Sequence, residues 1–479
     1  MKRYRIYINN DKVILRIIME KNGNIENLFV SKPNFEPEIG NIYKGRVDKF
    51  LQGLNSAFIN IGEIKSGFLQ LNKSEFYFSP DEDEEIRGNQ ILKEGKEVLV
   101  QICKPGEDEK SPKVTENVVL PGRFFVLIPC LKIQKISKKI EDRKERKRLM
   151  KIFKKAIGEK FGFVIRTAAF NKKDFYIYHE IEYLLNIWRR IKRDYKRKSA
   201  PSLLWKELPL YIKVLRDYVD ENCEFVEVDD EKIFREIIKY TNLFIPELRG
   251  KVNLYKNKIP MFIKYGFEER FENFISKIVS LPSGGYLIIE KGKTLTTIDV
   301  NSGSMEMEDF EQTAFRTNME AAEEIPRQIR CRNLSGLIVI DFIDIRKELK
   351  EKVFGRFVEN LKEDKSKINI LLISKLGLVE MAREKNDYSI YNLLLKECPY
   401  CEGSGMVESQ EIIYLQLRKK IFEFFSDKGY NEKLEIEISQ RLYEFIFKNQ
   451  LFKNFSFFDR IKFRVNSQLK KNDFKILRN

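Results

Sequence analysis

The chain has 479 residues, more than a single hydrophobic core can serve, so two to four domains are expected. Its 88 Lys and Arg outnumber its 72 Asp and Glu, and the net charge of +16 favours a polyanionic partner such as nucleic acid. Codon bias in an AT-rich genome would produce the same excess. No apolar run is long enough to span a bilayer and the N-terminus lacks a signal-peptide core, so we expect a cytoplasmic protein without a transmembrane segment.

Short strands separated by glycine and proline dominate the first hundred residues. Residues 3–18 predict two strands. Residues 40–71 form short alternating runs broken by four glycines, a pattern typical of a small antiparallel barrel, which a strand at residues 97–103 would complete. Two phenylalanines of this region, Phe58 and Phe68, could stack against bases beside the surface cations Lys44 and Arg46, or they could fill the barrel core as most phenylalanines do.

Helical patterns follow. Residues 132–160 are densely basic and helical in pattern, residues 162–166 predict a strand, and residues 173–198 predict a long helix. At the end of that strand Arg166 and Thr167 could hold a terminal phosphate, or they could simply close a strand at the surface.

The second half predicts a mixed α/β domain. Residues 284–300 indicate two strands, and residues 310–332 indicate an amphipathic helix in which Pro326 is expected to kink or end the helix. Further strands are predicted at residues 336–341 and 368–374. This strand–helix–strand alternation is typical of a sheet covered by helices.

Acidic and amide side chains stand at the ends of two predicted strands. Asp299 and Asn301 are two residues apart, so on a strand they point to the same face. Asp341 ends the next buried strand, and Asp344 follows three residues later. Such oxygen ligands can bind Mg²⁺ and leave positions for water. On spacing alone the commoner interpretations outweigh a metal site: a turn at Asp299 and Asn301, and a strand end facing solvent at Asp341.

Cys398 and Cys401 form a CxxC motif in ECPYCEGSG, whereas the other four cysteines are isolated. Structural zinc needs four ligands, and the chain has one histidine and no second cysteine pair. Two chains that each donate one pair to a shared zinc would satisfy the ion and would form a two-fold dimer. A redox CxxC and two incidental thiols are the alternatives, but no thioredoxin-like pattern surrounds the motif.

Four stretches together resemble the bacterial ribonuclease E/G family: LPSGGYLIIEKGKTLTTIDVNSGS, EQTAFRTNMEAAEEIPRQIRCRNLSGLIVIDFIDI, SKLGLVEMAR and ECPYCEGSG. The resemblance implies a magnesium-dependent endoribonuclease that hydrolyses single-stranded RNA, leaves 5′-phosphate products and is stimulated by a 5′-monophosphate. It also implies roles in rRNA and tRNA precursor processing and in mRNA decay. The rival class is a non-catalytic RNA-binding scaffold, against which the retained ligand positions argue.

The resemblance assigns roles to individual residues. It implies a catalytic group of Asp299, Asn301, Asp341 and Asp344, in which Asp299 and Asp341 bind magnesium. It implies zinc binding, shared between the subunits of a homodimer or homotetramer, by Cys398 and Cys401. It implies RNA binding by Phe58, Phe68 and Lys110. It implies 5′-phosphate sensing by Gly122, Val126, Arg166 and Thr167.

The fold implied is a multidomain α/β (α+β) architecture. Its expected parts are a discontinuous ribonuclease H-like subdomain (1–37 and 211–277), an OB-fold RNA-binding barrel (38–117), a 5′-phosphate sensor region (118–210), a DNase I-like catalytic domain (278–395), a zinc-link (396–406) and a small C-terminal dimerisation domain (407–479).

Overall fold

The computed structural model describes residues 3–477 except 34–37, 72–75, 79–84, 88–91, 107–109, 304–309, 372–373, 375–376, 402, 404, 454, 468 and 470–473. The side chains of 76–78 and 85–87 are also left undescribed. The chain divides into two compact units, residues 1–394 and 395–479. No helix within the described residues is long and apolar enough to cross a membrane.

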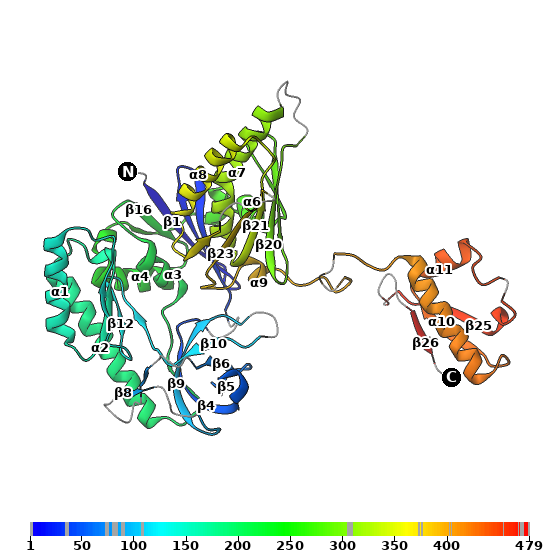
Figure 1. The fold of residues 1–479 in the computed structure, drawn as a ribbon, viewed down its shortest axis with the longest axis horizontal. Coiled ribbons are helices and arrows are strands. Elements are labelled where there is room, and N and C mark those ends of the chain that lie inside the picture. The colour runs from blue at the N-terminus through cyan, green and yellow to red at the C-terminus, as the bar shows by residue number, and fades with distance from the viewer. Residues whose placement is uncertain are drawn as a thin grey trace. The chain divides into compact units, whose positions relative to one another are not determined.

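The first sheet joins two distant parts of the chain (Figure 1). Its order is β17-β16-β1-β2-β3, with bounds β1 Tyr4–Asn10, β2 Leu15–Lys21, β3 Asn24–Ser31, β16 Cys223–Val228 and β17 Val252–Leu254. The helices packed on it are α3 Leu210–Tyr218, α4 Glu231–Phe244, α5 Met261–Lys264 and α6 Phe267–Glu272. Ile6 packs towards α3 and α4, while its neighbour Tyr7 packs towards α5 and α6. Both faces of the sheet are therefore buried.

Five strands close a barrel, because the order β4-β5-β6-β10-β9 returns to β4. The bounds are β4 Ile42–Leu51, β5 Ser56–Asn60, β6 Gly67–Gln70, β9 Glu97–Lys104 and β10 Lys113–Thr115. A sixth strand, β15 (Ser202–Trp205), pairs with β4, and a separate hairpin consists of β7 (Phe76–Phe78) and β8 (Glu85–Arg87). The barrel predicted from the glycine-broken runs is confirmed, but it is not wholly antiparallel, because β6 and β10 pair in parallel.

A four-stranded sheet, β11-β12-β14-β13, packs against two helices. The bounds are β11 Leu120–Pro121, β12 Phe125–Ile128, β13 Gln134–Ile136, β14 Gly162–Ile165, α1 Arg143–Ile157 and α2 Asp174–Arg197. The predicted strand at residues 162–166 and the predicted helix at residues 173–198 are confirmed. Trp188 of α2 and Phe163 of β14 lie in the common core.

The prediction of a helix throughout residues 132–160 is wrong in its first third. Residues 134–136 form β13, which pairs in parallel with β14. The backbone of this segment therefore bonds to a neighbouring strand instead of forming a helical turn. The helix begins only after Asp142, whose carboxylate accepts from the amides of Lys144 and Glu145 at 2.7 and 3.0 Å.

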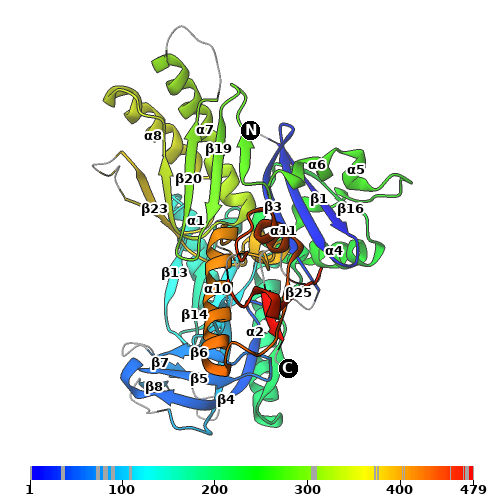
Figure 2. The same ribbon diagram turned by 90° about the vertical axis from the view of Figure 1, so that its right-hand side faces the viewer.

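The six-stranded sheet β18-β19-β20-β21-β23-β22 supports the candidate site. The strand bounds are β18 Ile278–Ser280, β19 Tyr286–Lys291, β20 Leu295–Asn301, β21 Gly336–Asp341, β22 Ile368–Ile370 and β23 Val379–Arg383. Two long helices, α7 (Phe310–Arg332) and α8 (Lys347–Leu361), lie side by side and bury one face of it (Figures 1 and 2). A short helix, α9 (Ile390–Leu394), ends this unit. Of the strand predicted at residues 368–374, β22 covers Ile368–Ile370, and residues 372–373 lie outside the described part of the chain.

Pro326 lies inside α7 and does not end it, contrary to one of the two expected outcomes. A proline removes the amide that would bond to the carbonyl four residues earlier. Here that carbonyl, on Ala322, accepts instead from the side-chain amide of Asn360 on α8 at 3.4 Å. The neighbouring helix thus replaces the missing donor, and α7 continues to Arg332.

The second unit has its own core. A three-stranded sheet, β25-β24-β26, packs against α10 (Gln410–Lys428) and α11 (Gln440–Lys448). Its strands are β24 Leu434–Ile438, β25 Ile461–Val465 and β26 Phe474–Leu477.

Candidate functional site

Asp299 and Asp341 lie level with each other on neighbouring strands. β20 and β21 are parallel, and their register pairs Asp299 directly with Asp341. On β20, Ile298 and Val300 point into the core, so Asp299 and Asn301 share the opposite face as predicted. Adjacent strands lie about 4.8 Å apart, which brings both carboxylates within reach of one small ion.

The remaining residues of this group occupy distinct positions. The side-chain amide of Asn301 donates to Asp299 Oδ2 at 2.9 Å and thereby orients that carboxylate. Asp344 is 94% exposed and forms an ion pair with Lys350 at 2.6 Å, which holds its pKa below the ordinary value. Both Asp341 and Asp344 line a cavity of about 200 Å³.

A residue that the sequence did not single out shapes this cavity. Asn318 of α7 is fully buried, and its amide oxygen and nitrogen bond to the backbone N–H and carbonyl of Ile343 at 3.0 and 2.8 Å. Asn318 therefore fixes the loop that follows Asp341. No periodicity could reveal this contact, because a polar residue within an amphipathic helix is most often solvent-facing.

The donor set that the two strands bring together consists of two carboxylates and one supporting amide. Among the described residues, no three or more His, Cys, Asp or Glu side chains gather where they could hold a metal ion. Mg²⁺ is usually bound by one or two carboxylates and keeps the rest of its shell for water and substrate phosphate. Asp299, Asp341 and the supporting amide of Asn301 match that pattern.

Phe58 and Phe68 form an aromatic pair on the outside of the barrel. They are register partners on β5 and β6, with ring centroids 5.6 Å apart, and both are half-buried. Their neighbours Ala57, Ile59 and Leu69 form the barrel core instead. The core alternative considered from the sequence is therefore wrong, and the pair is available for stacking. Lys110 is exposed in the loop before β10.

Lys44, which the sequence suggested as a surface cation, is buried. Its ammonium donates to the carbonyls of Tyr195 and Lys198 at 3.0 Å each and pairs with Glu97 at 2.7 Å. It anchors the end of α2 to the barrel. Arg46 is about half exposed and donates to the carbonyl of Ala200.

The structure brings three of the four predicted sensor residues together. Val126 pairs with Pro121 across the β11–β12 hairpin, and Gly122 lies at its corner. Arg166 Nη1 donates to the carbonyl of Gly122 at 2.7 Å, and both Arg166 and Val126 line a cavity of about 810 Å³. Thr167, the next residue, is exposed and shares a hydrogen bond with Ser137 at 3.0 Å.

An ion-pair network that the sequence did not suggest holds Arg166. The same nitrogen, Nη1, is 2.7 Å from a carboxylate oxygen of Asp217 on α3. Burial by itself would raise the pKa of Asp217. The charges and hydrogen bonds of Arg216 and Arg166 have the larger effect, so the pKa lies below its ordinary value. Arg216 is buried between Asp217 and Glu207 and also donates to the carbonyl of Pro121.

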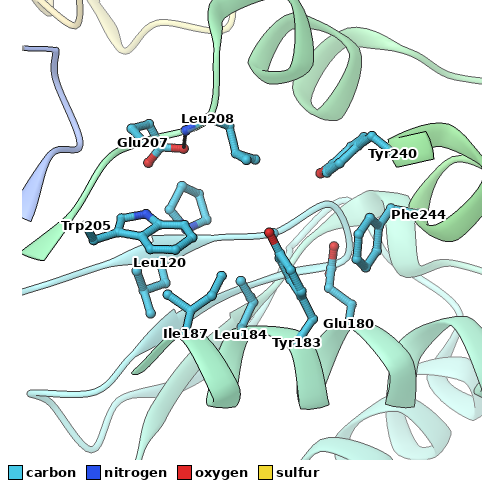
Figure 3. Close-up of a pocket in the computed structure, with 12 residues that line it drawn as sticks. Leu120, Glu180, Tyr183, Leu184, Ile187, Trp205, Glu207, Leu208, Tyr240 and Phe244 are labelled. Atoms are coloured by element: carbon cyan, nitrogen blue, oxygen red, sulfur yellow. Dashed lines mark hydrogen bonds between the residues drawn. The ribbon is translucent and has the colours of Figure 1, made fainter. Parts of the chain in front are cut away.

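Glu180 of α2 holds the same hairpin corner from beneath. Its carboxylate accepts from the backbone amides of Arg123 and Phe124 at 2.5 and 2.7 Å. A Cβ atom at Gly122 would lie 2.7 Å from this carboxylate, so a larger residue there would have to displace the Glu180 side chain. Figure 3 shows Glu180 beside Tyr183 in the wall of a cavity of about 20 Å³. Burial raises the pKa of Glu180 to about 7, although the two amides partly oppose the shift.

Cys398 and Cys401 lie in the second unit, where Cys398 is exposed and Cys401 half-buried. Hydrogen bonds from the amides of Tyr400 and Cys401 lower the pKa of the Cys398 thiol. The isolated cysteines Cys130, Cys223 and Cys331 are buried.

Comparison with known proteins shows the family. The model of the Ribonuclease E/G family matches residues 119–386. Ribonuclease G of Haemophilus influenzae is 33% identical over 418 residues, 86% of this chain and 85% of that protein. Ribonuclease G of Escherichia coli is 32% identical over 414 residues, 85% of each chain. Ribonuclease E of Buchnera aphidicola subsp. Schizaphis graminum is 36% identical over 420 residues, 85% of this chain but 43% of that protein. The chain belongs to the Ribonuclease E/G family.

Proposed function

We propose that this protein is a magnesium-dependent endoribonuclease that hydrolyses single-stranded RNA and leaves a 5′-phosphate on the downstream product. The observation that carries the proposal is the register of two parallel strands that sets Asp299 beside Asp341, on a sheet of a Ribonuclease E/G family member. A bound magnesium ion would supply an activated water and neutralise charge on the phosphate. The chain's part is to fix both carboxylates, with Asn301 orienting one of them.

The other parts of the fold fit the same activity. We assign the barrel as an OB-fold that grips RNA through Phe58 and Phe68, the sheet of β1–β3 with β16 and β17 as ribonuclease H-like, and the six-stranded sheet as DNase I-like. The half-buried aromatic pair on the barrel supports the first assignment, because stacking on aromatic side chains tolerates any base. Precursor rRNA, precursor tRNA and decaying mRNA are the proposed substrates.

A test of catalysis is neutralisation of each carboxylate in turn. Asp299→Asn and Asp341→Asn should abolish Mg²⁺-dependent cleavage of a 5′-monophosphorylated RNA while RNA binding persists, because only the ion's ligands change. Glu290→Gln, an exposed carboxylate on the adjacent strand β19, is the matched control and should cleave normally. Cleavage by both Asp variants at the wild-type rate would refute the site. Binding without any metal-dependent cleavage by the wild-type protein would favour the RNA-binding scaffold.

Two further features complete the proposal. Gly122, Val126, Arg166 and Thr167 are proposed to sense a 5′-monophosphate, because a guanidinium beside a backbone corner can bind phosphate through several charge-assisted bonds. Cys398 and Cys401 are proposed to share zinc with the same pair of a second chain, since one chain supplies only two of the four ligands.

A further inference from the structure

The exposed face of the C-terminal half of α2 is strongly basic. Five cations on it are exposed to solvent: Arg189, Arg190, Arg193, Lys196 and Arg197. Their spacing places them on one side of the helix, while Trp188, Ile191 and Tyr195 are buried on the other. We name these five residues the α2 stripe.

The fold does not require this charge. Like charges at these spacings destabilise a helix by about 0.2–0.5 kcal/mol per pair. Cations in a last helical turn can complement the helix dipole, but Arg189 and Arg193 lie before that turn. The end of α2 is already bound by the buried ammonium of Lys44, which bonds to two of its carbonyls. Asp194 is the acidic neighbour, and it lies 3.8 and 3.6 Å from Arg190 and Arg193.

The α2 stripe adjoins the RNA-binding barrel. Lys44 and Arg46 of β4 both bond to the backbone around the end of α2, and β15 pairs with β4 directly after it. Figures 1 and 2 both show the lower end of α2 alongside the barrel strands. The anchoring contacts fix the helix, so the stripe keeps its direction relative to the barrel.

We propose that the α2 stripe is a second, sequence-independent surface for the phosphodiester backbone of single-stranded RNA, extending the path of a strand that the barrel holds. This rests on the proposed function in taking RNA as the substrate. Arginine binds phosphate through paired hydrogen bonds, and three of the five cations are arginines within the run Arg189–Arg193. From Arg189 to Arg197 the stripe spans about 12 Å, more than one backbone contact needs.

RNA fits the stripe better than an anionic membrane does. A membrane-surface helix inserts its own apolar face into the lipid. The apolar face of α2 is occupied by the core that it shares with α1 and the four-stranded sheet. The stripe therefore offers charge without an insertable surface.

The test compares two quadruple variants with identical helix spacing. In one, Arg189, Arg193, Lys196 and Arg197 become Gln; in the control, the exposed α1 residues Lys147, Lys151, Lys154 and Lys155 become Gln. Binding of the full-length protein to poly(U) is measured over a range of salt concentrations. Each lost phosphate contact lowers the slope of log K against log salt by about 0.7, so the α2 variant should lose up to about 3 and the α1 control much less.

Cleavage kinetics give a second test of the α2 stripe. The α2 variant should raise KM for a long unstructured RNA more than it lowers kcat, because it removes binding rather than chemistry. Equal losses in both variants would show a general effect of net charge and overturn the inference, as would a wild-type slope in the α2 variant. Loss of binding to phosphatidylglycerol vesicles with RNA binding intact would assign the stripe to membranes instead. If the wild-type protein neither binds nor cleaves RNA, the proposed function itself fails.

Discussion

Glu180 offers a quantitative test of how the hairpin beside Arg166 is held. Burial raises its pKa from 4.5 to about 7. At about 1.4 kcal/mol per pKa unit, that shift corresponds to roughly 3 kcal/mol. Between about pH 4.5 and about pH 7 the folded protein binds this proton and the unfolded chain does not. The contribution of Glu180 to the free energy of unfolding is therefore largest below about pH 4.5. It falls as the pH rises and is constant again above about pH 7.

The Glu180→Gln variant should remove this pH dependence. The chain's two tryptophans report the relevant region, since Trp188 lies in the core of α2 and Trp205 lines the small cavity. The measurement is urea unfolding followed by tryptophan fluorescence at several pH values. The free energy of unfolding of the wild type, relative to the variant, should fall by roughly 3 kcal/mol between about pH 4 and about pH 8. Glu182→Gln, on the exposed side of α2, should follow the wild type. Parallel wild-type and Glu180→Gln curves would refute the reasoning.

Two further predictions concern the sensor and the zinc-link. Arg166→Gln should reduce the preference for 5′-monophosphorylated over 5′-hydroxyl RNA by roughly ten-fold or more, since a bond to a charged group contributes about 1.5–3 kcal/mol. Rates on matched RNAs measure this, and an unchanged preference would argue against the sensor. A zinc chelator, or Cys398→Ser with Cys401→Ser, should convert dimers to monomers in light scattering. A double variant that stays dimeric would contradict a shared zinc.

The parts of the fold that were predictable are those governed by short-range periodicity. The span of α7 matches the amphipathic run at residues 310–332, and alternation on β20 put Asp299 and Asn301 on one face. Both follow from patterns within a few residues. The level pairing of Asp299 with Asp341 was not predictable in this way, because it depends on the register between two strands.

What the sequence could not indicate depends on partners far along the chain. Ala322 receives a hydrogen bond from Asn360, so α7 continues through Pro326. Lys44 is buried because the end of α2 supplies two carbonyls for its ammonium. The contact of Arg166 with Asp217 crosses between elements 51 residues apart. None of these partners lies within a few residues of the group that it contacts. A local sequence pattern therefore favours the commoner outcome, which is an exposed cation or a helix that ends at proline.

The connection between the two site strands also shapes the site. Two adjacent parallel strands need a crossover, and α7 makes the crossover from β20 to β21. Asn318 belongs to that same helix and bonds to both backbone groups of Ile343, just beyond Asp341. The helix that connects the two aspartates along the chain thus also fixes the loop leading to Asp344. The position of the candidate metal ligands therefore depends on how α7 packs, and not only on the strands that carry them.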